Sequence, residues 1–184
     1  MITVFFLLAF VFVAVVLLLR KTRGARARRH QRYRQTANRV LLKLPELKAG
    51  QQVVYLRKIN PYVFEEMILT AIERRGIPVR RNHSYSGDGG IDGQFWTGQE
   101  RWLVQAKRFA SAVRPEHVRQ FGELARKEKC NGLFVHTGRT GLISFKHFSD
   151  YPEIILVSGS SLLQLLSGES VEHILRPLNK RHSR

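Results

Sequence analysis

The chain has 184 residues, a formal net charge of +17 and a single cysteine. This length is enough for one domain with a core of moderate size, so the fold does not depend on a disulfide or a structural metal. One cysteine also excludes an intrachain disulfide and every zinc site built from two or more thiolates. The excess of positive charge favours a polyanionic partner, either nucleic acid or anionic lipid.

The first 19 residues carry no charged side chain, and this apolar run ends abruptly at Arg20 and Lys21. About 20 apolar residues in a helix span a hydrocarbon core of roughly 30 Å, so residues 1–19 are predicted to form a transmembrane helix. A cleaved signal peptide is the alternative, but no basic residue precedes the run and no small-residue cleavage pattern follows it. We therefore expect a single-pass anchor in the lipid bilayer, with its N-terminus outside.

A basic segment follows the apolar run, and residues 20–39 contain nine Lys or Arg residues and no acid. Positive charge beside a span is typical of its cytoplasmic side, and each such charge contributes about 1 kcal/mol of attraction to an anionic surface. We interpret residues 20–50 as a basic juxtamembrane linker that binds anionic lipid through residues 20–39. Direct DNA contact by this segment is the less favoured alternative. Residues 40–48 favour a short amphipathic helix, and residues 49–51 indicate a break before the folded domain.

Helix and strand patterns alternate in the rest of the chain. Apolar residues at three-and-four spacing predict a helix over 61–75, with Asn60 as its N-cap, Pro61 in its first turn and Gly76 at its end. The elements expected after it are a strand at 77–80, a glycine-rich loop at 84–90, a hairpin of strands at 91–96 and 101–108, a helix from 115, a strand at 133–137, a helix at 142–148, a strand at 154–157 and a helix at 160–166. This order indicates an α/β sandwich with a central mixed sheet flanked by helices. The folded domain is expected at residues 51–170, before a basic tail at 171–184.

Three polar side chains fall together on the predicted hairpin. Gln105 and Lys107 are two residues apart on one strand, so they point to the same face. Counting back from the turn pairs Trp96 with Arg101 and sets Asp92 opposite Gln105, with Cβ atoms about 5 Å apart. Carboxylate and amide oxygens suit Mg²⁺, which can acidify a water, and a nearby ammonium can neutralise charge that develops on phosphorus. The grouping therefore predicts hydrolysis of a phosphodiester.

These residues stand in a pattern that resembles a known family. Gly89-Gly90-Ile91-Asp92, followed by Gln105-Ala106-Lys107, is similar to the Asp…(Glu/Gln)-x-Lys signature of the Mrr-type restriction endonuclease catalytic domain, a branch of the PD-(D/E)XK nuclease superfamily. Phe64-Glu65 on the first domain helix and the strand that ends at Thr137 resemble two further motifs of this family. The resemblance extends from about residue 57 to about residue 166 and implies a restriction-endonuclease-like fold.

The resemblance also implies a role for each matched residue. Asp92 would be the principal metal ligand, Gln105 a neutral ligand or a contact just outside the ion, and Lys107 the catalytic lysine. Glu65 would complete the metal site from the helix. We prefer it to Glu66 because Glu65 lies on the shoulder of the helix's apolar face, whereas Glu66 points nearly opposite. Gln105 stands where many superfamily members have Glu, which removes one negative charge and should weaken metal binding.

Other polar and aromatic residues near these motifs have plainer interpretations. Asp88 is interpreted as a turn residue, and Trp96 and Trp102 as packing residues. The histidines of the domain lack ligand spacing and are interpreted as structural, namely His83, His117, His136 and His147. Scattered arginines are candidates for contacts with DNA phosphates, each as readily explained by a solvated surface: Arg80, Arg81, Arg108, Arg114 and Arg119.

The leading hypothesis is a Mg²⁺-dependent endodeoxyribonuclease at the inner face of a bacterial cytoplasmic membrane, with Mn²⁺ as a substitute ion. Its substrate would be DNA, its suggested role defence against foreign DNA, and a homodimer would allow it to cut both strands. A second hypothesis is a DNA-binding module of the same fold that has lost turnover, which Gln105 would permit. A third is a membrane-surface interaction protein whose charge is directed at lipid alone.

Overall fold

The computed structural model describes residues 2–82, 90–169 and 174–175. Within these residues, five strands form one sheet in the order β1-β2-β3-β4-β5. The strands are β1 (Val79–Arg81), β2 (Gly93–Thr97), β3 (Glu100–Lys107), β4 (Asn131–His136) and β5 (Ile154–Val157). The first three pair antiparallel, and β3, β4 and β5 pair parallel. The sheet is therefore mixed, as the sequence predicted.

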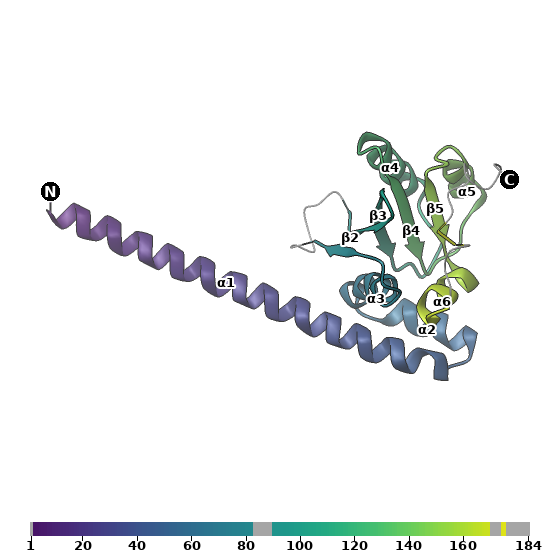
Figure 1. Ribbon diagram of the computed structural model, residues 1–184, viewed down its shortest axis with the longest axis horizontal. Helices are drawn as coiled ribbons and strands as arrows, with labels where there is room; N and C mark the ends of the chain where they lie inside the picture. The colour runs from purple at the N-terminus through teal and green to yellow at the C-terminus, as the bar shows by residue number, and fades with distance from the viewer. Residues whose placement is uncertain (1, 83–89, 170–173, 176–184) are drawn as a thin grey trace.

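Helices cover both faces of this sheet (Figure 1). One face carries α3 (Pro61–Glu73), α6 (Gly159–Ser167), α2 (Ala49–Lys58) and the end of α1 (Ile2–Lys43), and the other carries α4 (Pro115–Lys127) and α5 (Leu142–Ser149). Alternation along β3 separates the two cores, because Trp102 and Val104 pack on the first face and Leu103 on the second. The α/β sandwich expected from the sequence is confirmed.

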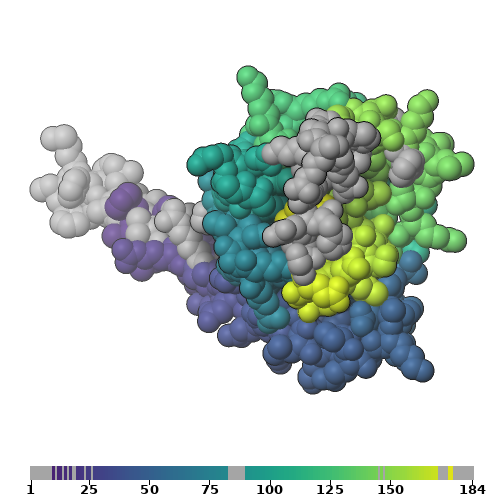
Figure 2. Space-filling model, turned by 45° about the vertical axis from the view of Figure 1, so that its right-hand side comes forward, coloured from purple at the N-terminus to yellow at the C-terminus, as the bar shows by residue number. Residues whose placement is uncertain are grey.

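The long helix α1 projects from the domain and then joins its core (Figure 1 and Figure 2). Ala37, Val40 and Leu41 are buried in the core cluster that contains α3. Residues 40–43 therefore complete α1 instead of forming a separate helix, and the chain turns through the short helix η1 (Leu44–Glu46). The predicted break at residues 49–51 was also wrong, since Ala49 begins α2. The apolar residues of this region find their partners on α3 and α6, which no local pattern reveals.

The predicted transmembrane helix at residues 1–19 falls within the first half of α1. Among the residues that the structure describes, no helix has the length and apolar character needed to cross a membrane. The prediction of a transmembrane span is therefore not supported.

Local signals in the domain are confirmed. Asn60 caps α3, because its Oδ1 accepts a bond of 2.9 Å from the Tyr62 amide. Gly76 follows the end of α3 with φ 75°, a conformation that favours glycine. In the hairpin, Trp96 pairs with Arg101 as predicted.

Two predicted segments lie largely outside the described residues. One is the glycine-rich loop at 84–90, which includes Asp88, and the other is the basic tail at 171–184. Ile174 and Leu175, which the prediction assigned to the tail, are described and are buried against the first core.

Candidate active site

Asp92 lies immediately before β2 and is held against the neighbouring strand. Its amide donates to the Val104 carbonyl at 2.8 Å, and its Oδ2 accepts from the Ala106 amide at 2.6 Å. The backbone pairing of β2 with β3 stops at Gly93. Asp92 therefore bonds to Val104 and Ala106, the two neighbours of Gln105, and does not pair with Gln105 directly. The carboxylate is thereby fixed next to Gln105, close to the position that the register predicted.

Gln105 is buried and its amide has one defined orientation. Its Nε2 donates to the Gly90 carbonyl at 2.7 Å. That carbonyl can only accept, so Nε2 must face it and Oε1 must face away. Oε1 is buried and has no hydrogen-bond partner among the residues that the structure describes. A buried acceptor without a donor costs about 1–3 kcal/mol, which a bound cation would offset.

Gly90 makes this arrangement possible. Its φ of 85° lies in the region that glycine adopts without strain, and a Cβ at this position would collide with Gln105 Nε2. The lack of a side chain at Gly90, two residues before Asp92, thus lets the Gln105 amide reach the backbone.

Glu65 lies on α3 and belongs to the same electrostatic environment. Burial, followed by the negative charge of Asp92, raises the pKa of Glu65 to about 8, while the charge of Lys107 acts in the opposite direction. Burial also raises the pKa of Asp92 to about 7, although the Ala106 amide and Lys107 both favour its ionised form. Two desolvated carboxyl groups with one ammonium beside them lack positive charge, and a divalent cation would supply it.

Glu66 is buried, although it was expected to point nearly opposite the apolar face of α3. It is 1% exposed, and its Oε2 accepts from Arg81 Nε at 2.8 Å. His30 on α1 lies 3.7 Å from its other oxygen. The reason is that α1 covers the side of α3 that faces away from the sheet, so both sides of this helix are packed. Glu66 is engaged in structure, which leaves Glu65 as the carboxylate available to the site.

Lys107 is the last residue of β3 and shares a face with Gln105. It pairs in register with His136 on β4. His136 is fully buried, and burial lowers its pKa to about 4, so its ring is neutral. His117 on α4 stacks on Phe109 with ring centroids 5.7 Å apart. Burial, then the charges of Lys107 and Arg114, lower the pKa of His117.

These two histidines lie nearer to the candidate site than the sequence indicated. The Nδ1 atoms of His117 and His136 are both buried, and neither has a hydrogen-bond partner in the described part of the chain. Their spacing in the sequence carried no sign of this, because one is on a helix and the other on a strand. The strand register with Lys107 could have shown the neighbour on β4.

The arginines considered for phosphate contacts differ in their availability. Arg81 and Arg119 form ion pairs with carboxylates, Arg80 donates to a glutamine side chain, and Arg108 donates to a backbone carbonyl. Arg114 is exposed, and no ion pair with it is found in the described part of the chain. Trp102 is fully buried as predicted, and its Nε1 donates to Thr97.

The donor set suits a hard divalent ion. Within the described residues, no group of three or more His, Cys, Asp or Glu side chains gathers as a metal site would. The donors here are two carboxylates and one amide oxygen, and Mg²⁺ needs few protein oxygens because it keeps several waters. The unpartnered Gln105 Oε1 and the raised pKa values of Asp92 and Glu65 both fit such an ion.

Residues 56–166, more than half of the chain, match the model of the Mrr_cat family, which is described as restriction endonuclease. The chain belongs to this family. Membership in Mrr_cat implies a nuclease that hydrolyses DNA, and the matched residues contain Glu65, Asp92, Gln105 and Lys107.

Other comparisons add little to the Mrr_cat assignment. One similar solved structure is that of restriction endonuclease FokI, with a TM-score of 0.48 and 9% sequence identity. The similarity covers 72% of this chain and 29% of the FokI chain, so less than a third of that protein is represented here. A comparison with curated proteins finds no match.

Proposed function

We propose that this protein is a metal-dependent endodeoxyribonuclease whose reaction centre consists of Glu65, Asp92, Gln105 and Lys107. The observation that carries the proposal is the buried Oε1 of Gln105, which is held facing away from Gly90 and has no donor. The carboxylate of Asp92 is fixed on the same hairpin by the amide of Ala106, the residue that follows Gln105. An amide oxygen and a carboxylate positioned in this way are suitable ligands for Mg²⁺ or Mn²⁺.

Each residue has a distinct task in this proposal. Asp92 and Gln105 would hold the ion from the hairpin, and Glu65 would hold it from α3. A divalent ion in this position supplies a more acidic water and positive charge for the phosphoryl group. Lys107, on the same strand face as Gln105, orients the attacking water and neutralises charge that develops on the phosphate oxygens. The bond from Ala106 keeps the Asp92 carboxylate in one orientation, so little reorganisation is needed during the reaction.

The test is plasmid cleavage by the full chain in Mg²⁺ or Mn²⁺. We expect metal-dependent conversion of supercoiled DNA, and Asp92→Asn and Lys107→Ala should each reduce the rate by at least about 100-fold. Lys127→Ala is the matched control, because Lys127 is an exposed lysine on α4 and should cut at the normal rate. Absence of cleavage by the unmutated protein on both methylated and unmethylated DNA would refute the proposal.

Gln105 also favours a second candidate, a DNA-binding module of the same fold without turnover. An amide in place of a carboxylate brings one negative charge less to the ion and lowers its affinity. In that case the full chain would bind DNA in a salt-dependent way and show no cleavage at any Mg²⁺ or Mn²⁺ concentration.

The proposed location rests on the sequence alone. The uncharged residues 1–19 and the basic residues 20–39 are the reason to propose association with the inner face of a bacterial cytoplasmic membrane, through apolar contact and anionic lipid. Fractionation of cells that express the full chain tests this, and recovery in the supernatant after high-speed centrifugation would contradict it. A homodimer, also proposed, would be detected by light scattering in detergent.

A further inference from the structure

Basic side chains of the domain differ in their partners. Arg81, Arg101, Arg119 and Arg126 each lie 2.5–2.8 Å from a carboxylate oxygen. Their charges are therefore neutralised within the protein.

Several other exposed cations have no such partner among the described residues, and three of them lie close to the ends of β3 and β4. In the described ranges, no ion pair with Lys58, Arg114 or Arg139 is found, and all three are exposed. Glu116 is the acid nearest to Arg114 in the sequence, and it is bound to Arg119 and Gln120. We name Lys58, Arg114 and Arg139 the basic edge.

Backbone contacts join the segments that carry the basic edge. The Val113 amide donates to the Arg139 carbonyl at 2.9 Å, and the Arg139 amide donates to Ser111 at 3.2 Å. The loops after β3 and β4 are therefore paired. Arg57, next to Lys58, donates to the Thr137 carbonyl at 2.9 Å, which ties the end of α2 to the same loops.

A second arginine strengthens this frame. Arg108 Nη1 donates to the Arg57 carbonyl at 2.7 Å, and Thr137 Oγ1 bonds both the amide and the carbonyl of Phe109. Arg57 and Arg108 thus act as bridges between loops. The exposed cations are carried by a network of hydrogen bonds instead of by free loops, so less conformational entropy is lost when an anion binds.

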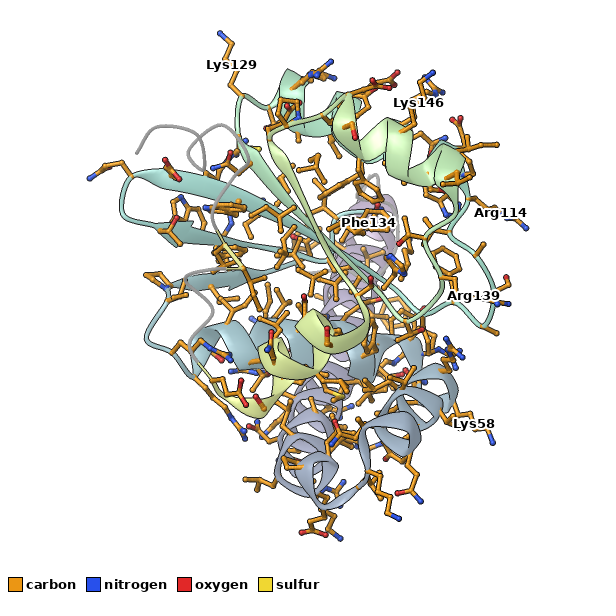
Figure 3. All side chains as sticks on the ribbon, turned by 90° about the vertical axis from the view of Figure 1, so that its right-hand side faces the viewer. Lys58, Arg114, Lys129, Phe134, Arg139 and Lys146 are labelled. Atoms are coloured by element: carbon orange, nitrogen blue, oxygen red, sulfur yellow. The ribbon has the colours of Figure 1, made fainter. Side chains whose placement is uncertain are left out.

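The basic edge lies at the carboxyl ends of β3 and β4, where Lys107 ends its strand. Figure 3 shows Lys58, Arg114 and Arg139 along one side of the domain, with Lys129 at the opposite end. Three exposed cations that have no ion pair within the described ranges lie next to the strand end that carries Lys107, and such a row matches a ligand that presents several phosphates. The DNA backbone is such a ligand.

We propose that Lys58, Arg114 and Arg139 bind the phosphates of a DNA duplex next to the reaction centre and position the strand over Lys107. The inference rests on the proposed function for its substrate class, but it does not require turnover. Since phosphates carry no sequence information, the basic edge supplies affinity and orientation without sequence preference.

The test measures binding of the full chain to a labelled DNA duplex in EDTA, so that cleavage cannot interfere. The Arg114→Ala/Arg139→Ala variant removes two phosphate contacts. Its slope of log K against log salt should become shallower by about 1.8, which corresponds to an affinity loss on the order of 100-fold at 50 mM salt. Adding Lys58→Ala should reduce the slope by about 0.9 more, equally on duplexes of different sequence.

The matched control is Lys127→Ala/Lys129→Asn, which removes the same charge from the end of the domain opposite the basic edge. Asparagine is chosen because Lys129 has φ 50°, which asparagine tolerates. This control should bind DNA as the unmutated chain does. The charge-conserving Arg114→Lys/Arg139→Lys variant should keep the salt slope, which separates loss of contact from loss of fold.

Several outcomes would overturn the inference. Equal DNA affinity of the basic-edge variant and the unmutated chain would do so, as would equal losses in the basic-edge variant and the Lys127/Lys129 control. If the basic-edge variant lost binding to phosphatidylserine vesicles but kept binding to DNA, the surface would be a lipid site instead. If the unmutated chain bound DNA through the basic edge but never cut it, the inference would hold and the nuclease proposal would fail.

Discussion

Replacement of Gln105 by Glu tests whether Oε1 is the atom that faces the ion. Gln105→Glu removes the Nε2 donor, which lies 2.7 Å from the Gly90 carbonyl, and places a carboxylate oxygen there. Loss of that bond, with a third acid next to Asp92 and Glu65, should cost about 3 kcal/mol of unfolding free energy in metal-free buffer at pH 8. In saturating Mg²⁺ the added charge should instead improve binding. A tenfold gain in affinity would add about 1.4 kcal/mol to the metal-dependent stabilisation.

The assay is urea unfolding of the variant and the unmutated chain, with and without Mg²⁺. Gln99→Glu is the control, because it adds the same negative charge at an exposed residue of the hairpin turn, away from the proposed metal site. Gln105→Glu should be less stable than the unmutated chain without metal, and Mg²⁺ should stabilise it more than it stabilises the unmutated chain. If the Mg²⁺ increment is the same in both proteins, Oε1 does not face the ion, and the assignment of Gln105 as a ligand is refuted.

Two further predictions concern the carboxyl groups of α3 and of Asp92. Glu66→Gln breaks a buried pair with Arg81 and should cost about 3 kcal/mol of unfolding free energy. Glu73→Gln is the control, because its side chain is 41% exposed, and it should cost less than about 1 kcal/mol. Equal losses of both variants in urea unfolding would show that the buried pair contributes no more than the exposed one. The raised pKa values of Asp92 and Glu65 mean that the folded chain binds more protons than the unfolded chain between about pH 4 and about pH 8, so metal-free stability should fall as pH rises through this window. Asp92→Asn should flatten that dependence, and a variant with the unmutated pH profile would contradict the pKa shift.

The order of elements from Pro61 onward could be predicted because its signals are local. Asn60 and Gly76 mark the two ends of α3 by capping and by positive φ, and both act within a few residues. The hairpin register follows from the short turn that begins at Gly98, since a short loop leaves few ways to pair the strands. The grouping of Asp92, Gln105 and Lys107 depended on that register and on the alternation of strand side chains.

The N-terminal region could not be predicted in the same way. The burial of Val40 and Leu41 depends on α3, which is some twenty or more residues away in the sequence. The burial of Glu66 could not be foreseen for the same reason. Helical periodicity locates a residue on a helix surface but does not say that α1 will cover the surface opposite the sheet. Local patterns therefore described the hairpin well and the α1–α3 interface poorly.

The orientation of the Gln105 amide depends both on a local pattern and on a contact with a residue distant in the sequence. Its position on β3 follows from alternation, but the direction of Oε1 depends on the carbonyl of Gly90, which reaches Nε2 only because residue 90 has no Cβ. A glutamate at position 105 would not be held by that carbonyl, since neither oxygen of a carboxylate can donate to it. Glycine at 90 and glutamine at 105 are thus matched to each other. Gly90→Ala should therefore displace the Gln105 amide and reduce the stabilisation by Mg²⁺ in urea unfolding, whereas Gln105→Glu should increase it.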